Sequence, residues 1–460
     1  MAGLSTMRTA PVFLATVAAL LCVSCGGGEP GTAPSPVGPG TLYQVSDPVT
    51  ATLKSINAMP SVRNALAAIQ RDEPRSVSDQ VALSQIPSPP FKEGNRAQEY
   101  LRRLTGLGLE NVHRDREGNV YGLRRGVGGG PTMFVSAHLD TVFPEGTDVT
   151  VAQRAGRYYG PGISDDARGL VAVLAVARAL RGAGIQTRGD IIFGGTVGEE
   201  GLGNLRGVKA FFADNPGVDG FITIEPGGPE KVIYEATGSR RYEIAFTGPG
   251  GHSFGDFGRP SAIHAMARAI TKMSDVRPPR SPKTTFTVGV VEGGTSVNAI
   301  AGTARMQLDM RSNDPVELDK IEKQLLPLAD AGAGEENLRW NAPEGKGVTA
   351  RSSLIGDRPA GTQDRNSPIV QASFASAGLL GLRPSLQPAS STDANVPISL
   401  GVPAVRLGGG GGAGNTHSYT DKEWFDPTDA QLGPQNALLA TLAMVGVAGE
   451  TSTAPLLPSR

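Results

Sequence analysis

The chain has 460 residues, enough for roughly two to four domains and a sizeable core. Lys and Arg total 43 and Asp and Glu total 44, a net charge of −1. This charge excludes a nucleic-acid binder driven by charge alone, because phosphate contacts need a basic excess or a basic face. The two cysteines, Cys22 and Cys25, lie at the start of the chain, so a zinc ion in the remainder would need His and carboxylate ligands.

An apolar run near the N-terminus is typical of a secretory signal. Residues 10–22 are apolar, a run too short to cross a membrane, which takes roughly 20 such residues. The following LCVSC resembles a bacterial lipoprotein cleavage box, although Cys22 stands where that box usually has Leu. We therefore expect a signal peptide over 1–24, a lipidated Cys25 and a flexible Gly/Pro-rich linker over 25–45. The protein would be exported and held in the cell envelope, at the outer membrane or in the periplasm, by its lipid anchor only. An ordinary secretory signal cut nearby is the alternative.

Short apolar runs alternate with helical patterns from about residue 60. The runs at 131–137, 190–197, 219–224 and 402–407 predict buried strands, and 168–182 predicts a well-packed helix. This alternation predicts an α/β catalytic domain with a mixed sheet and helices on both faces, made of residues 60–238 and 357–450.

Residues 239–356 predict a second domain inserted into the first. Strand-like RRYEIAFTG leads to a helix at 260–275, then to the strands TTFTVGVVEGG and NAIAGTARMQLDMRS. A helix follows with Asp314 as N-cap and Pro315 as its first residue, and a last strand lies near 348–354. This β-α-β-β-α-β order predicts a ferredoxin-like α+β domain. RRYEIAFTG and helix 260–275 offer an edge strand and an amphipathic face for a homodimer.

Five segments carry acids and imidazoles after the predicted strands or just before a helix. A solvated turn or a cap explains each one singly, but together they bring metal-ligand residue types to one edge of the sheet. His138 and Asp140, at i and i+2, would face one side, so that Asp140 could hold the imidazole. Two His and three carboxylates, one of them shared, would satisfy two zinc ions. The segments are SAHLDTV (His138, Asp140), YGPGISDDARG (Asp165, Asp166), TVGEEGLGN (Glu199, Glu200), TIEPGG (Glu225) and GNTHSYT (His417).

These segments, in this order over 132–418, resemble the dizinc exopeptidase family of peptidase T, glutamate carboxypeptidase and acetylornithine deacetylase. The resemblance implies Glu199 as general base and Asp140 as the group that orients a ligand imidazole. It also implies a ligand set: His138 and Glu225 on one zinc, Glu200 and His417 on the other, and Asp165 bridging both.

The resemblance continues into the inserted domain through GPGGHSFGDFGRPSA and GTSVNAIAG. It implies that His252 reaches an active site, commonly that of a partner subunit. Asn298 and Arg311 would contact the substrate carbonyl and its terminal carboxylate. Two features depart from the family: Ala167-Arg168-Gly169 stands where Lys-Gly-Gly is frequent, and the run after Gly408 is unusually rich in glycine.

The expected activity is a metal-dependent hydrolysis of amide bonds in small peptides by an activated water, with two divalent ions. Zinc fits the ligands, and cobalt or manganese would be tolerated. An N-acyl amino acid deacylase of the same family and a catalytically silent peptide-binding lipoprotein are the alternatives. We expect no serine nucleophile elbow of the G-x-S-x-G type, and no cysteine is available for an acyl-enzyme route. His113 is expected at the surface and His264 in a structural role.

Overall fold

The computed structural model describes residues 43–418, 422–449 and 451–459, and the chain divides into the units Met1–Gln44 and Val45–Arg460. The predicted signal peptide, Cys25 and nearly all of the predicted linker fall outside the described residues. Within the described part of the chain, no helix combines the length and the apolar character needed to cross a membrane.

The larger sheet has eight strands in the order β1-β2-β6-β3-β7-β16-β8-β15. Its centre, β6, β3, β7 and β16, is parallel, while β1, β2 and β8 pair antiparallel with their inner neighbours, so the sheet is mixed as predicted. The four central strands lie within two residues of the predicted bounds. The strands are β1(Glu110–Arg114), β2(Val120–Arg124), β3(Thr132–His138), β6(Asp190–Thr196), β7(Gly220–Glu225), β8(Lys231–Ile233), β15(Ser385–Leu386) and β16(Ala404–Gly408).

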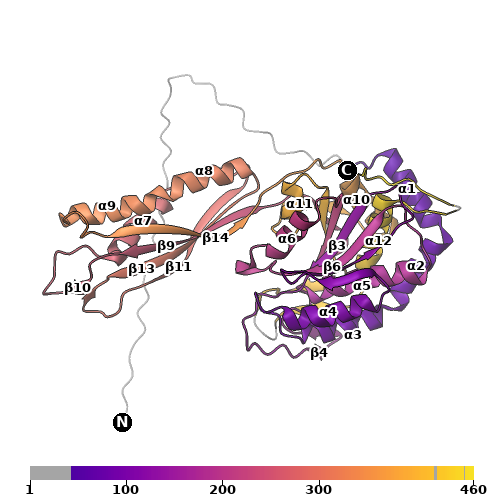
Figure 1. Cartoon of the computed structure of the whole chain (residues 1–460), viewed down its shortest axis with the longest axis horizontal. Helices are drawn as coiled ribbons and strands as arrows, with labels where there is room; N and C mark the ends of the chain where they lie inside the picture. Colours follow the sequence, from indigo (N-terminus) through magenta and orange to yellow (C-terminus); the bar gives the residue numbers. More distant parts are fainter. Residues whose placement is uncertain (1–42, 419–421, 450, 460) are drawn as a thin grey trace, which may run out of the picture. The chain divides into compact units, whose positions relative to one another are not determined.

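Helices cover both faces of this sheet, as the sequence predicted (Figure 1). On one face, α5(Ala167–Gly182) and α12(Leu432–Val445) pack directly on β3 and β7. On the other face, α6(Arg206–Asp214) and α11(Asn395–Ser399) share a core with Phe134, Ile192 and Phe221 of the sheet. Five more helices complete the first layer, and the first of them begins at Asp47, before the predicted start of the domain at residue 60. They are α1(Asp47–Ala58), α2(Pro60–Arg71), α3(Glu73–Ser84), α4(Gly94–Thr105) and α10(Pro368–Leu379).

The inserted segment forms a four-stranded antiparallel sheet in the order β11-β13-β9-β14. Three helices pack on it, and the chain order is the predicted ferredoxin-like one (Figure 1). Alternation along β13 explains the packing, because Met306, Leu308 and Met310 are buried in the core shared with the helices. The elements are β9(Gly238–Thr247), α7(Ala262–Ser274), β11(Thr284–Gly293), β13(Thr303–Ser312), α8(Pro315–Leu325), α9(Pro327–Arg339) and β14(Thr349–Arg358).

Two expectations about this domain need correction. The RRYEIAFTG strand, β9, is not an edge strand, because it pairs with β13 on one side and β14 on the other; the edges are β11 and β14. The helix that follows Asp314 is two helices, since Pro327 has no N–H to continue α8 and begins α9 instead. The Asp314 N-cap is confirmed: its carboxylate accepts hydrogen bonds from the N–H groups of Val316 and Glu317 at 2.8 and 3.0 Å.

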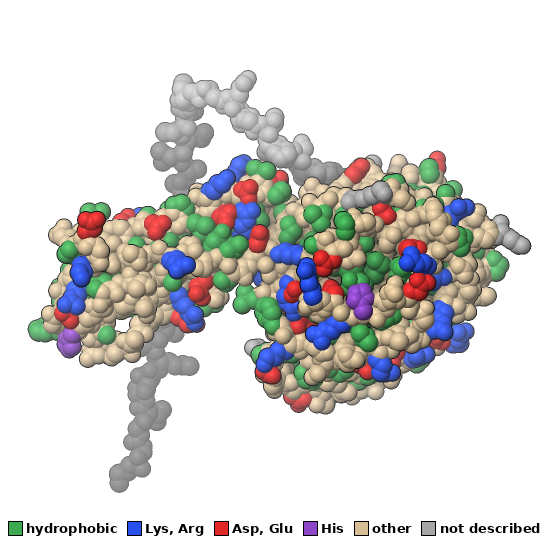
Figure 2. Space-filling model, viewed as in Figure 1, with side chains coloured by type: hydrophobic (Ala, Val, Ile, Leu, Met, Phe, Trp, Pro, Cys, Tyr) green, Lys and Arg blue, Asp and Glu red, His purple; other side chains and the backbone are tan. Residues whose placement is uncertain are grey.

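Two small sheets complete the fold. One has the order β17-β18-β5-β4 and connects the chain after His417 to the chain before α5. The other is a two-stranded pair, β10 with β12. Figure 2 shows acidic and basic side chains mixed over the face that is drawn, in keeping with the net charge of −1. The bounds are β4(Ala152–Arg154), β5(Arg157–Tyr159), β10(Gly251–His252), β12(Ala299–Ile300), β17(Gly412–Gly414) and β18(Trp424–Asp426).

Candidate metal centre

The carboxyl ends of the four central strands meet at one edge of the larger sheet. His138 is the last residue of β3, and Glu225 is the last residue of β7. Glu199 and Glu200 follow β6, and His417 follows β16 after the glycine-rich segment. Because these strands are parallel, their ends share one edge. A cavity of about 390 Å³ lies there, and its lining includes Asp165, Glu199, Glu200, Glu225 and His417.

Asp165 lies between the two imidazoles. Its Oδ1 is 2.9 Å from Nε2 of His138, and its Oδ2 is 3.2 Å from Nε2 of His417. The same Nε2 of His417 is 2.9 Å from Oε1 of Glu200, and Nε2 of His138 is 4.0 Å from Oε2 of Glu225. One carboxylate thus presents a separate oxygen to each half of the cluster. This is the arrangement required of a ligand shared by two ions.

Two groups of three residues could each hold a metal ion, because the possible ligand atoms within a group all lie within 4.8 Å of one another. One group is His138, Asp165 and Glu200, and the other is His138, Asp166 and Glu225. Asp166, however, is already engaged. Its Oδ1 accepts a hydrogen bond from Gly169 N–H at 3.0 Å, capping α5, and its Oδ2 accepts one from His138 N–H at 3.0 Å. Of the adjacent acids, Asp165 therefore has the freer oxygens, and Asp166 shapes the backbone around it.

Asp140 orients its neighbours differently from the expectation. β3 ends at His138, so Asp140 lies in the following loop and the strand argument of i and i+2 does not apply. Nδ1 of His138 lies 3.0 Å from the backbone oxygen of Asp140 and 3.6 Å from its Oδ1. The carboxylate instead accepts hydrogen bonds from the N–H groups of Glu199 and Glu200 at 3.0 and 2.8 Å. Asp140 thereby fixes the imidazole and the acid pair together.

Burial sets the electrostatics of the cluster. Burial raises the pKa of Glu225 to about 7. It also raises the pKa of Glu199 well above its ordinary value, and the positive charge of Arg358 offsets only part of that shift. Hydrogen bonds to Asp165 and Glu200 raise the pKa of His417 to about 10. Carboxylates removed from water and crowded together favour a neighbouring positive charge. A divalent cation held by two imidazoles and carboxylate oxygens satisfies that requirement, so the residues present fit such an ion.

Glu199 forms a buried ion pair with an arginine, Arg358. Its Oε1 is 3.2 Å from Nη1 of Arg358, the last residue of β14, and its backbone oxygen also accepts a hydrogen bond from Nη2. The side chains of Glu199 and Arg358 are 7% and 6% exposed, so this ion pair is buried. Glu199 belongs to neither group of possible ligands. Sequence reasoning missed Arg358, because nothing local marks a residue 159 positions away as a partner.

Two further buried acids escaped the sequence reasoning. The Asp393 carboxylate accepts a hydrogen bond from the Thr196 hydroxyl at the end of β6, and burial raises the pKa of Asp393 to about 6. Glu423 binds the loop that carries Asp165. No local pattern marks either acid: Asp393 follows the polar run SST, and Glu423 lies between a lysine and a tryptophan. Acids in such surroundings are mostly exposed.

The inserted domain contributes arginines to the cavity. Arg311 lines it together with Arg241 of β9, and Asp309 accepts hydrogen bonds from Nε of both at 2.8 and 3.0 Å. His252 and Asn298 lie elsewhere. Both are exposed on the β10–β12 side of the domain, and within the described residues neither belongs to the lining of the cavity. The structure therefore brings together every predicted site residue except these two.

The run Gly251–Gly255 reads GHSFG, so the G-x-S-x-G pattern is present, contrary to the expectation. Ser253 nevertheless lies in a turn after the two-residue strand β10, not between a buried strand and a helix. The structural context of a nucleophile elbow is missing at this serine. His113 is exposed on β1, as expected, and His264 is exposed on α7 with Nδ1 3.4 Å from Glu336.

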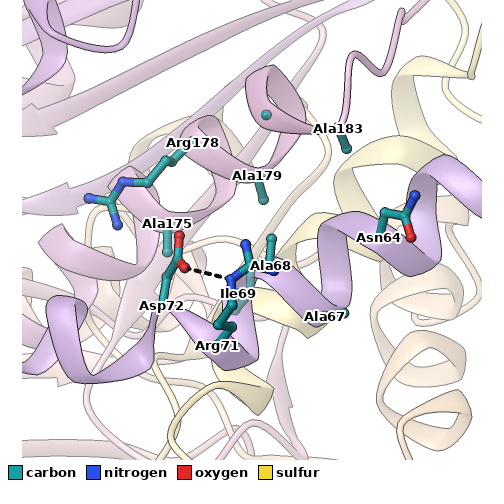
Figure 3. Close-up of a pocket in the computed structure, with 11 residues that line it drawn as sticks. Asn64, Ala67, Ala68, Ile69, Arg71, Asp72, Ala175, Arg178, Ala179 and Ala183 are labelled. Carbon is teal, nitrogen blue, oxygen red and sulfur yellow. Dashed lines mark ion pairs between the residues drawn. The ribbon is translucent and has the colours of Figure 1, made fainter.

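A second pocket, of about 350 Å³, lies between α2 and α5 (Figure 3). It shares no lining residue with the first cavity. Alanines form much of its wall, and its charged groups are Arg71, Asp72 and Arg178. Arg71 and Asp72 pair with each other at 3.3 Å. With one carboxylate and no imidazole, this pocket lacks the ligand types that the first cavity gathers.

Comparison with known proteins places the chain in a family. Residues 134–444, more than half of the chain, match the model of peptidase family M20/M25/M40. The chain is 26% identical over 351 residues to YqjE of Bacillus subtilis, covering 73% of this chain and 90% of that protein. It is also 26% identical over 264 residues to a succinyl-diaminopimelate desuccinylase of Leptothrix cholodnii, covering 52% of this chain and 69% of that enzyme.

Solved structures share the fold. Aminopeptidase PepT of Bacillus cereus superposes with a TM-score of 0.65 at 23% identity, covering 80% of this chain and 97% of that one. YXEP of Bacillus subtilis, described as a dinuclear metal-binding peptidase, gives a TM-score of 0.61 at 15% identity, covering 82% and 99%. These identities support the architecture and leave the substrate to the site itself.

Proposed function

Because the chain belongs to peptidase family M20/M25/M40, a family of metal-dependent hydrolases, we propose that it cleaves amide bonds in small peptides at the cavity beside β3, β6, β7 and β16. One observation carries the proposal. Asp165 presents one oxygen to His138 and the other to His417, within a cluster that also holds Glu200 and Glu225.

In this proposal two divalent ions, most simply zinc, are held by five residues. His138 and Glu225 hold one, Glu200 and His417 hold the other, and Asp165 is shared. Such a pair of ions, when bound, polarises the scissile carbonyl and makes a water acidic enough to lose a proton near neutral pH. Asp140 holds the imidazole of His138 through its carbonyl and the backbone of the acid pair through its carboxylate.

Glu199 acts as the general base. Its carboxylate lines the cavity but pairs with neither imidazole, since His138 lies against Asp165 and Glu225 and His417 against Asp165 and Glu200. It can therefore accept the proton of the attacking water. The same carboxyl group then gives that proton to the leaving amine. Arg358 holds both the side chain and the backbone of Glu199, and this fixes the direction in which the carboxylate points.

Arg311 receives the carboxylate of the substrate. Its guanidinium lines the cavity, and its hydrogen bond with Asp309 uses Nε, which leaves the outer nitrogens for a bidentate contact. An N-acyl amino acid carries the same carboxylate beside the same kind of amide, so a deacylase remains the second candidate.

The test is hydrolysis combined with metal analysis. The purified protein should contain two divalent ions per chain and should hydrolyse members of a panel of dipeptides, tripeptides and N-acyl amino acids, with activity lost to a chelator and restored by zinc. Preference for N-acyl substrates would select the deacylase. Bound metal and bound peptide without hydrolysis of any substrate would instead identify a silent peptide-binding protein.

We further propose that His252 and Asn298 serve the site of a partner subunit in a homodimer. Both are exposed and outside the cavity of their own chain, and the edge strand β11 exposes Val290 and Val291 for pairing. There His252 would donate a hydrogen bond to the oxyanion that develops on the scissile carbonyl. His252→Ala should therefore lower turnover by about 100–1,000-fold, the usual effect of losing one such donor.

Complementation separates the two subunits. Mixing His252→Ala chains with Glu199→Ala chains should restore about a quarter of the wild-type activity, because half of the random dimers then own one complete site. No recovery, together with a monomeric mass by light scattering, would contradict the partner role and place His252 in its own subunit.

Export is the remaining proposal, and it concerns residues outside those that the structure describes. Lipidation of Cys25 would place the protein in membrane fractions that resist salt washing, since the lipoprotein pathway adds more than one acyl chain. Cys25→Ser should release the protein or block its processing. A mature wild-type protein that starts at another residue and stays in the soluble fraction would reject the anchor and leave the hydrolase proposal intact.

A further inference from the structure

The loop that carries Asp165, residues 160–166 between β5 and α5, is bound by a single buried carboxylate. Glu423, which is fully buried, accepts four hydrogen bonds from it. Oε2 accepts from Gly162 N–H at 2.9 Å. Oε1 accepts from Ser164 N–H at 2.9 Å, from the Ser164 hydroxyl at 2.8 Å and from Asp165 N–H at 3.0 Å. The backbone oxygen of Glu423 also accepts a hydrogen bond from Gly160 N–H at 3.2 Å.

Helix α3 binds the same loop through its carbonyl groups. Nε2 of Gln80 donates to the oxygen of Ile163 at 2.6 Å, and the Ser84 hydroxyl donates to the oxygen of Pro161 at 2.9 Å. Both side chains are fully buried. The loop belongs to no sheet at these residues, so side chains satisfy the buried backbone groups that a ladder would otherwise satisfy. These contacts hold the loop, together with its internal hydrogen bonds and those of Asp166.

The contact with Asp165 N–H connects this clamp to the candidate metal centre. Asp165 has to direct one oxygen at each imidazole, and a small rotation of its backbone would move one oxygen out of reach. Glu423 also lies six residues after His417, so one segment supplies an imidazole and the anchor of the shared carboxylate. Four donor groups converge on the two oxygens of Glu423, so a side chain that presents an N–H group there would break this set of contacts.

We propose that Glu423 is a positioning residue for Asp165, and that it sets the affinity of the site for its ions without contacting ion or substrate. The proposal rests on the proposed function, because it assumes that Asp165 is the shared ligand. Groups that orient metal ligands typically change metal affinity by about 10–100-fold when they are removed. A buried glutamate that only stabilised the fold would change the unfolding temperature and leave the affinity of the folded protein unchanged.

The test is titration of the metal-free, folded protein with zinc by calorimetry and with cobalt by visible absorption. Glu423→Gln keeps the size of the side chain but turns an amide N–H₂ toward the loop donors. It should weaken metal binding by about 10–100-fold and change the cobalt spectrum. Asp426→Asn is the matched control: Asp426, the last residue of β18, lies three residues after Glu423 and pairs with Arg157 at 3.0 Å instead of the loop. This control should bind zinc and cobalt as the wild type does.

Ser164→Ala provides a second variant if Glu423→Gln does not fold, since it removes only the hydroxyl hydrogen bond. It should lower the affinity in the same direction by a smaller factor. Wild-type affinity and a wild-type cobalt spectrum in the folded variants would overturn the role of Glu423, whatever their unfolding temperatures. If the wild-type protein itself binds no divalent ion, the proposed function fails; if it binds two and the variants bind equally well, only this inference fails.

Discussion

Glu199→Gln is expected to lower kcat by about 100–10,000-fold, the usual contribution of a general base, while the metal content stays at two ions per chain. Glu199 lines the cavity but belongs to neither group of possible ligand atoms. The amide side chain keeps the shape of the carboxylate and cannot take the proton of a water. The measurement is steady-state kinetics on the best substrate of the panel, with metal analysis of the same samples.

Glu200→Gln is the matched comparison, because Glu200 is the adjacent acid and lies 2.9 Å from His417. It should lose metal as well as activity. Glu199→Gln and Glu199→Ala both remove the charge that faces Arg358, but Gln keeps an oxygen that can accept the hydrogen bond from Nη1, whereas Glu199→Ala removes that acceptor as well and is the less clean variant. If Glu199→Gln lost metal and Glu200→Gln kept it, the roles of the two acids would be reversed.

Asp165→Asn should remove most of the bound metal and at least about 100-fold of the activity, because loss of a shared ligand exceeds the effect of losing a group that only orients one. The amide nitrogen would replace one of the two carboxylate oxygens: either Oδ1, which is 2.9 Å from Nε2 of His138, or Oδ2, which is 3.2 Å from Nε2 of His417. One half of the cluster would thus lose an anionic oxygen. Metal analysis and zinc titration of the folded variant provide the measurement.

Asp148→Asn serves as the control for this substitution. Asp148 is an acid whose Oδ1 accepts a hydrogen bond from Thr150 N–H at 2.9 Å, and it does not line the cavity. It should keep both metal and activity. An Asp165→Asn protein that is folded, binds two ions and turns over substrate normally would refute the shared-ligand assignment and, with it, the proposed metal centre.

The four central strands of the catalytic domain and the order of elements in the inserted one could be predicted from the amino-acid sequence. Both follow from local periodicity: continuous apolar runs give the buried parallel strands, and β13 alternates between buried and outer residues. The sequence also determined which residues gather at the candidate centre. A polar residue that ends one of four parallel strands is placed by topology, so His138 and Glu225 could be placed at this edge without knowing any contact, while their roles as ligands came from the resemblance to the exopeptidase family.

The hydrogen bonds that hold these residues in place could be seen only in the folded chain. Arg358 reaches Glu199 across 159 positions, and Glu423 reaches Asp165 across 258. The carboxylate of Asp140, expected on the imidazole of His138, lies 3.6 Å from its Nδ1 and also accepts hydrogen bonds from the backbone of the acid pair. The strand expected at the edge, β9, lies inside its sheet, since both β13 and β14 pair with it. Periodicity reports which face of an element is buried, but a hydrogen bond between distant segments depends on where the folded chain places both partners, and no local pattern encodes that.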